Sequence, residues 1–214
     1  MNIIIVSNSC VGWSIYEKLK SKYNSPFIGT MIPSDDEYLK LCNNLIFYMS
    51  VEPICNITAK NNTTFAIQSG SPRYQHQEVS LDYPIIHLND IEVHCVHEKD
   101  CGIALDKFNR RRERMLNIIA TGQYMIFNTW SYGDLFVDHV NISSLIFQFL
   151  NIETDHMKSI FLGSSSLKIE HPNYLTATEW DHVDVSERTP SHTYRFNDQR
   201  LAVRYFHQLI KPSP

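Results

Sequence analysis

The chain has 214 residues, a formal net charge of −4 and 43% hydrophobic residues. This length suits one α/β domain over residues 1–214, and the acidic balance argues against a nucleic-acid partner. No stretch approaches the length of a membrane span, and the first residues lack the basic region of a secretory signal. We therefore expect a cytoplasmic protein without a membrane span.

The five cysteines are odd in number and irregularly spaced, at positions 10, 42, 55, 95 and 101. In a cytoplasmic protein this pattern predicts free thiols and no disulfide framework.

Residues 3–6 (Ile-Ile-Ile-Val) are typical of a buried strand. Residues 7–13 follow and are called the opening turn. The spacing of Ser14 and Glu17 is typical of a capping box and predicts a helix that begins there and ends before Pro26. We expect a central strand that hands over to this helix at Cys10. Ligands of open α/β sheets bind at that edge, and a helix N-terminus favours a thiolate. Cys10 is therefore a candidate nucleophile, and a buried structural cysteine is the alternative.

No glycine-rich dinucleotide fingerprint or Walker-type phosphate loop follows this strand. Ser7, Asn8 and the backbone at Gly12 are still placed to contact an anionic or oxyanionic substrate.

A second capping box at residues 34–37 predicts a helix with Tyr38, Leu41, Cys42, Leu45, Ile46 and Met49 on one stripe. Residues 51–82 are expected to form an irregular insertion.

Further strands are predicted near residues 82–88, 91–97, 123–128 and 159–162, and helices near 101–117 and 141–150. Residues 163–214 form a less certain C-terminal extension with a final helix near 197–210. The alternation indicates an open, mainly parallel sheet with helices on both faces, Rossmann-like but without the dinucleotide fingerprint.

His97 ends the alternating stretch 91–97. If this strand is parallel to the first, His97 shares an edge with Cys10 and is the natural general base. Glu92 and His94 are candidate substrate contacts, and Asp90, Glu92 or Glu98 is the candidate carboxylate that orients His97. A hydrogen-bonded structural histidine is the alternative, and the histidine spacing does not indicate a metal site.

Arg110, Arg111 and Arg114 crowd one helix. The default is a solvated helix face, while phosphate recognition by one or two of them is the functional alternative. Trp130 follows a predicted strand, where it suits sugar stacking or simple packing.

Five segments together resemble one known family: residues 5–12, 24–29, 38–45, 90–97 and 108–114. The family is an uncharacterised bacterial domain of unknown function found with exopolysaccharide and capsule biosynthesis genes. The resemblance covers about residues 3–130 and implies an intracellular role in surface-glycan assembly, without supplying a reaction.

Three hypotheses follow. In the first, the protein is an acyl- or acetyltransferase in which Cys10 is the nucleophile, His97 the base, and Arg110 or Arg111 contacts a phosphate of coenzyme A or a nucleotide sugar. The second is a glycosyltransferase acting on a nucleotide sugar. The third is a non-catalytic glycan-binding or assembly protein in which Cys10 is buried.

Overall fold

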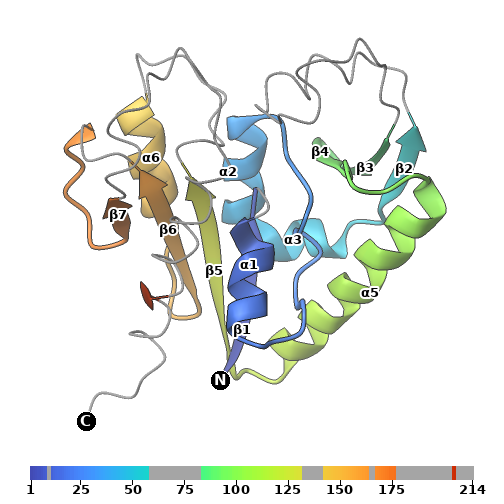
Figure 1. The fold of residues 1–214 in the computed structure, drawn as a ribbon, viewed down its shortest axis with the longest axis horizontal. Coiled ribbons are helices and arrows are strands. Elements are labelled where there is room, and N and C mark those ends of the chain that lie inside the picture. The colour runs from blue at the N-terminus through green and yellow to red at the C-terminus, as the bar shows by residue number, and fades with distance from the viewer. Residues whose placement is uncertain (9–10, 58–82, 132–141, 164–166, 177–203, 206–214) are drawn as a thin grey trace.

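The computed structural model describes residues 1–8, 11–57, 83–131, 142–163, 167–176 and 204–205. Its centre is a four-stranded sheet in the order β1-β5-β6-β7, with every neighbouring pair parallel (Figure 1). The strands are β1 (Asn2–Ser7), β5 (Tyr124–Ser131), β6 (Met157–Gly163) and β7 (Tyr174–Thr176). Among the described residues β1 lies at an edge of this sheet, so the prediction of a central opening strand is wrong, whereas β5 is central.

A second, antiparallel sheet has the order β2-β3-β4, with β2 (Ile54–Ile57), β3 (Pro84–Leu88) and β4 (Ile91–His94). The turn between β3 and β4 is Asn89-Asp90, and Asn89 has a φ of 58°. A two-residue turn beginning with a left-handed Asn joins antiparallel neighbours. The α/β class and the parallel sheet are therefore confirmed, but residues 84–94 form a hairpin of the separate antiparallel sheet and no strand of the parallel sheet.

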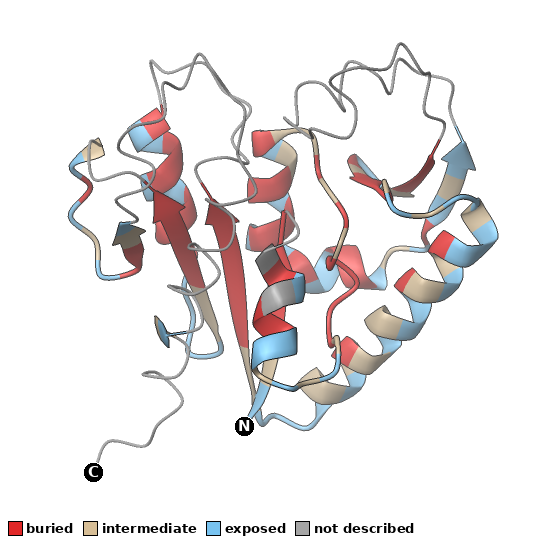
Figure 2. Ribbon diagram, in the orientation of Figure 1, coloured by how far each residue is buried: buried red, intermediate tan, exposed pale blue. Residues whose placement is uncertain are grey.

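Five helices lie within the described residues: α1 (Val11–Lys18), α2 (Asp35–Asn43), α3 (Leu45–Ser50), α5 (Cys101–Ala120) and α6 (Ile142–Leu150). Successive residues of β1 point to opposite faces of the sheet. Ile4 and Val6 join the large core with α2, α5 and α6, while Ile5 joins a smaller cluster with Ile15 and Tyr16 of α1. Figure 2 shows β5 and β6 buried along most of their length and α5 exposing one side.

The caps predicted before α2 and α5 are confirmed, but the capping box at Ser14 and Glu17 is wrong as a helix start, because α1 begins at Val11 and already contains Ser14. Ser34 accepts a hydrogen bond from Glu37 N at α2, and Asp100 accepts one from Ile103 N at α5. The single helix expected after residue 34 is interrupted at Asn44, so that α3 starts a new helix and Ile46 is exposed.

Cys55 of β2 and Cys101 of α5 form a disulfide, with their Cα atoms 5.6 Å apart. The prediction of free thiols is therefore wrong for this pair, while Cys42 and Cys95 are free and buried. The two bonded residues are 46 positions apart, and their approach depends on the packing of β2 against α5, which spacing alone does not reveal.

No helix in the described part of the chain is long and apolar enough to cross a membrane. Most of the insertion 51–82 and of the final helix expected at 197–210 lies outside the described residues.

Candidate functional site

The opening turn is held against the segment that follows α1. Asn8 is buried, its Nδ2 donates to Ile32 O at 3.0 Å, and its Oδ1 accepts from Ile32 N at 2.6 Å. Both ends of the amide are therefore used inside the fold, so Asn8 positions the turn. Ser7 is buried at the end of β1. Cys10, the predicted nucleophile, lies outside the described residues.

Gly12 allows a close approach between α1 and its surroundings. A Cβ at this position would lie 2.7 Å from Ile28 Cδ1 and 3.0 Å from Ser7 Cβ, closer than real side chains pack. The glycine therefore lets the first turn of α1 rest directly on the end of β1 and on Ile28.

The connecting segment, residues 27–32, joins the opening turn to the small sheet. Met31 and His94 exchange backbone hydrogen bonds of 3.0 and 2.8 Å, which pair the segment with β4. Two residues earlier, Gly29 has a φ of 73°, and a Cβ there would lie 3.7 Å from His97 Cδ2. His97 therefore lies beside Gly29, and Ile28, the residue before Gly29, packs on Gly12.

This arrangement corrects the reason for pairing His97 with the opening turn. The pairing was predicted from parallel strands sharing an edge, but β4 belongs to the antiparallel sheet and ends at His94. His97 is exposed and follows the strand. The connecting segment is what brings His97 near Gly12, because Gly29 lies beside His97 and the adjacent Ile28 packs on Gly12.

His94 is 6% exposed and lies between two partners. Its Nδ1 is 2.9 Å from Tyr83 Oη, and its Nε2 is 3.3 Å from Glu92 Oε2. Glu92 N in turn donates to Glu37 Oε2 at 2.9 Å. Because both ring nitrogens of His94 have partners within the fold, this histidine holds the hairpin together, as the structural alternative describes.

The three predicted arginines all come from α5, and two are fixed by backbone carbonyls. Arg111 Nη1 donates to Ile28 O at 2.9 Å, and Arg114 Nη1 donates to Tyr23 O at 2.6 Å. The guanidinium of Arg111 also lies 5.3 Å from the centre of the Tyr23 ring, in cation–π range. Arg110 is exposed.

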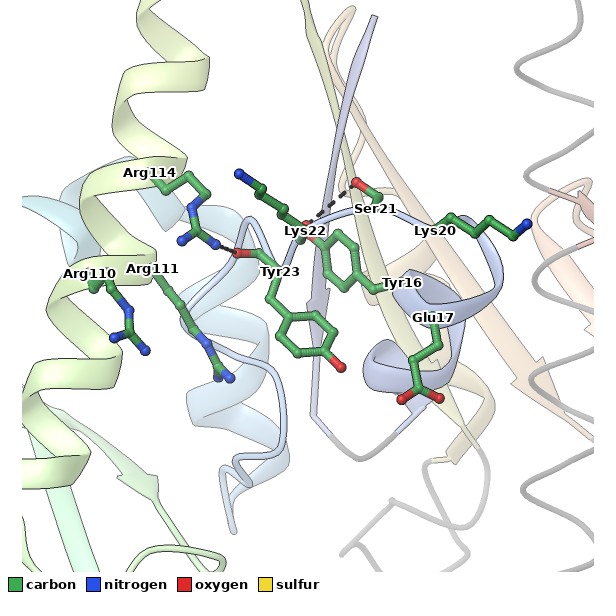
Figure 3. A pocket seen from close by; sticks show the side chains of 9 residues that line it. All are labelled: Tyr16, Glu17, Lys20, Ser21, Lys22, Tyr23, Arg110, Arg111 and Arg114. Carbon is green, nitrogen blue, oxygen red and sulfur yellow. Dashed lines mark hydrogen bonds between the residues drawn. The ribbon is translucent and has the colours of Figure 1, made fainter.

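These arginines line a hollow of about 640 Å³ between α5 and the C-terminal end of α1 (Figure 3). Its lining consists of Tyr16, Glu17, Lys20, Ser21, Lys22, Tyr23, Arg110, Arg111 and Arg114. We call it the basic hollow, because five of these side chains are cationic and one is a carboxylate. Sequence reasoning found the arginines but missed Lys20 and Lys22, whose alternation with Lys18 on a short stretch was a usable signal.

Glu17, the one carboxylate of the basic hollow, accepts a hydrogen bond of 2.6 Å from Trp13 Nε1. It extends from α1 on the side opposite the arginines (Figure 3). Tyr16 is tied down as well, since its hydroxyl accepts a hydrogen bond from Ile5 N at 2.9 Å, and burial strongly raises the pKa of that hydroxyl.

Trp130 lies apart from this region, in the large core. It is 1% exposed and makes edge-to-face contacts with Tyr38 and Phe149, with ring centres 5.1 and 5.2 Å apart. A side chain this deeply buried leaves no room for a sugar ring to stack on it, which matches the packing alternative. Within the described residues, no group of three or more His, Cys, Asp or Glu side chains is placed to hold a metal ion.

Fold and site together define an α/β protein in which a parallel sheet, a small antiparallel sheet and an arginine-bearing helix meet around one connecting segment. Residues 1–120 match the family model described as Domain of unknown function (DUF1919), and the chain belongs to this family. The predicted membership of a family of unknown function is thereby confirmed. Its link to exopolysaccharide genes stays a prediction.

One relative is an uncharacterized protein of Haemophilus influenzae (strain ATCC 51907 / DSM 11121 / KW20 / Rd). It is 27% identical over 111 residues, which are 52% of this chain and 43% of the relative. The match thus spans less than half of the relative's length. The opening turn, His97 and the three arginines all fall inside the 120 residues that match the family model.

Proposed function

We propose that the protein is an acyltransferase of surface-polysaccharide biosynthesis, with Cys10 as nucleophile and His97 as general base. As in Rossmann-like folds, the proposed reaction centre lies at the carboxyl end of a parallel strand, here β1. We infer the glycan acceptor from the resemblance of the sequence motifs to a family found with exopolysaccharide and capsule biosynthesis genes. The transfer chemistry follows from the opening turn and its neighbours.

One observation carries the proposal: three candidate elements converge on the neighbouring residues Ile28 and Gly29. Gly12 of the opening turn packs on the Ile28 side chain, and His97 lies beside Gly29. Arg111 donates a hydrogen bond to Ile28 O. The sequence places Cys10 two residues before Gly12, and a thiol, a base and a cation are the parts that covalent acyl transfer needs.

The reaction has two steps. The Cys10 thiolate attacks the thioester carbonyl of the donor, the carbon–sulfur bond to the donor breaks, and the donor thiolate takes up the proton that His97 removed from Cys10. An acceptor hydroxyl then attacks the Cys10 thioester while His97 accepts its proton, and Cys10 leaves with that proton. The base must act in both steps, so His97 matters for each.

The test is to incubate the protein with acetyl-coenzyme A and to look for an acetylated Cys10 peptide by mass spectrometry. We expect a mass increase of one acetyl group on Cys10, which is absent from Cys10→Ala and formed much more slowly by His97→Gln. Cys42→Ala is the matched control, because Cys42 is a buried thiol in the core.

Absence of acylation in the wild-type protein, together with a Cys10→Ala variant that behaves identically in every assay, would remove the acyltransferase proposal. Turnover of a nucleotide sugar by the Cys10→Ala variant would instead support the glycosyltransferase hypothesis.

A further inference from the structure

The basic hollow concentrates positive charge in a chain whose net charge is −4. Arg111 and Arg114 are anchored by backbone carbonyls, whereas the side chains of Arg110 and Lys22 make no hydrogen bond or ion pair within the described part of the chain. Burial and the neighbouring charge of Arg110 lower the pKa of Arg111. Cations that are held together without matching carboxylates gain most from a bound anion.

The hollow has the size of a ligand site and a defined geometry. Its volume of about 640 Å³ lies within the range of pockets that bind small molecules and cofactors. In Figure 3 the three arginines project from α5 toward Tyr23, while the amine of Lys20 points away from them. The cations gathered on one side of the hollow are therefore the arginines and Lys22, and the Tyr23 ring lies beneath the guanidinium of Arg111.

The hollow and the opening turn lie at opposite ends of α1. The opening turn includes the first turn of this helix, and Tyr16, Glu17 and Lys20 line the hollow at or just beyond its end. A helix of eight residues is about 12 Å long. Arg111 links the two places, since it lines the hollow and donates to the carbonyl of Ile28, whose side chain contacts Gly12.

We propose that the basic hollow binds the phosphate groups of a donor whose reactive thioester sits on a long arm, the chemistry of coenzyme A. The phosphates rest between Lys22 and the arginines, and the arm follows residues 23–29 to the opening turn. In a nucleotide sugar the reacting carbon is bonded directly to a phosphate oxygen, so a donor of that kind held in the hollow stops short of the opening turn. This inference rests on the proposed acyl transfer at Cys10.

The test measures binding by isothermal titration calorimetry at low salt, with coenzyme A, pantetheine and a uridine diphosphate sugar as probes. We expect coenzyme A to bind, pantetheine to bind far more weakly, and affinity for coenzyme A to fall as salt rises. Arg110→Gln and Lys22→Gln should each weaken coenzyme A binding by about tenfold, the loss of one charge-assisted contact. Arg112→Gln is the control, since it removes an arginine from the same helix that does not line the hollow.

The outcomes separate this inference from the proposed function. Cys10→Ala should bind coenzyme A as tightly as the wild-type protein. A wild-type protein that binds coenzyme A but is not acylated by acetyl-coenzyme A refutes the acyltransferase and leaves the hollow as a phosphate site. Acylation of Cys10 with an unchanged KM in Arg110→Gln and Lys22→Gln refutes the hollow. Equal binding of pantetheine and coenzyme A, or tighter binding of the sugar nucleotide, also overturns it.

Discussion

At the scale of single residues, the region around the opening turn depends on two small side chains in different ways. Asn8 forms two hydrogen bonds with the backbone of Ile32, so the end of β1 and the connecting segment hold each other in place. Gly12 contributes through the absence of a side chain, because α1 can approach Ser7 and Ile28 only without a Cβ. Both residues place neighbouring groups and need not touch a substrate.

Gly12→Ala should destabilise the protein by about 1–3 kcal/mol, the usual cost of overpacking a close contact. The new methyl group would meet Ser7 Cβ at 3.0 Å, and it can relieve its 2.7 Å contact with Ile28 only by moving that side chain. Urea unfolding gives the measurement. Gly102→Ala is the control, because Gly102 is exposed, its nearest neighbour is the capping oxygen Asp100 Oδ1 at the longer distance of 3.2 Å, and alanine favours the helix. Equal effects of the two substitutions would contradict the packing argument.

The thiols should differ sharply in reactivity. Burial raises the pKa of Cys95 to about 12, with a contribution from Glu98, and burial also raises the pKa of Cys42. Since the thiolate is the reactive form, neither should react with iodoacetamide at pH 8 in the folded protein. We expect the folded, non-reduced chain to carry one fast label, at Cys10, in peptide mass spectrometry.

Unfolding in urea should release Cys42 and Cys95 for labelling and serves as the positive control. A Cys10 that reacts only after unfolding would support the non-catalytic hypothesis. Fast labelling of Cys95 in the folded state would show that the burial argument is wrong.

At the scale of elements, the sequence predicted the positions of helices and strands better than it predicted which strands pair. The starts of α2 and α5 and the positions of β1 and β6 follow from capping residues and apolar runs, which act within one turn or strand. The hairpin of β3 and β4 was placed in the wrong sheet, because hydrophobic alternation does not say which strand is the neighbour. The Asn89-Asp90 turn between two apolar runs was the available signal for antiparallel pairing.

The same limit applies to the candidate site. Arg111 was found from charge crowding, but its partner Ile28 O lies 83 positions away. Trp130 was expected in a turn after the strand but lies within β5, and only its packing with Tyr38 and Phe149 shows that it belongs to the core. Long-range contacts, which no local pattern encodes, decide the role of each of these side chains.

The hairpin is tied to the two helices preceding it through Asp90. Lys40 of α2 and Tyr48 of α3 donate to this carboxylate at 3.0 and 2.9 Å, and these hydrogen bonds lower its pKa from the usual 3.8 to about 2. A depressed pKa means that the stabilisation is fully present well above pH 3.8 and is lost as the pH falls toward 2. A carboxyl-detected NMR titration should show Asp90 as one of the last carboxylates to protonate.

Lys40→Met should return the pKa of Asp90 toward its usual value, and Tyr48→Phe should raise it by a smaller amount, in keeping with the order of the two hydrogen-bond contributions. Lys158→Met is the control, because its partner is Glu153 on another part of the surface. An Asp90 titration that stays unchanged in Lys40→Met would show that the crosslink does not persist in solution.

At the scale of the whole molecule, the disulfide and the expected location point in different directions. Disulfides are typical of oxidising compartments, whereas a cytoplasmic location predicts reduced thiols. The Cys55–Cys101 bond joins the edge of the small sheet to the first turn of the helix that carries the arginines. The redox state of this pair therefore depends on the compartment in which the protein resides, and it affects the stability of the protein.

Reduction of the Cys55–Cys101 bond should lower the free energy of unfolding by about 2–4 kcal/mol, because it frees a loop of 46 residues in the unfolded chain. Urea unfolding with and without dithiothreitol measures the difference, and the double variant Cys55→Ser/Cys101→Ser should not respond to the reductant. The hollow lies toward the far end of α5, where Phe108 and Met115 pack that helix into the core, so coenzyme A binding should survive reduction. Identical midpoints with and without reductant in the wild-type protein would mean that the bond does not form in solution, which is the state that a cytoplasmic location predicts.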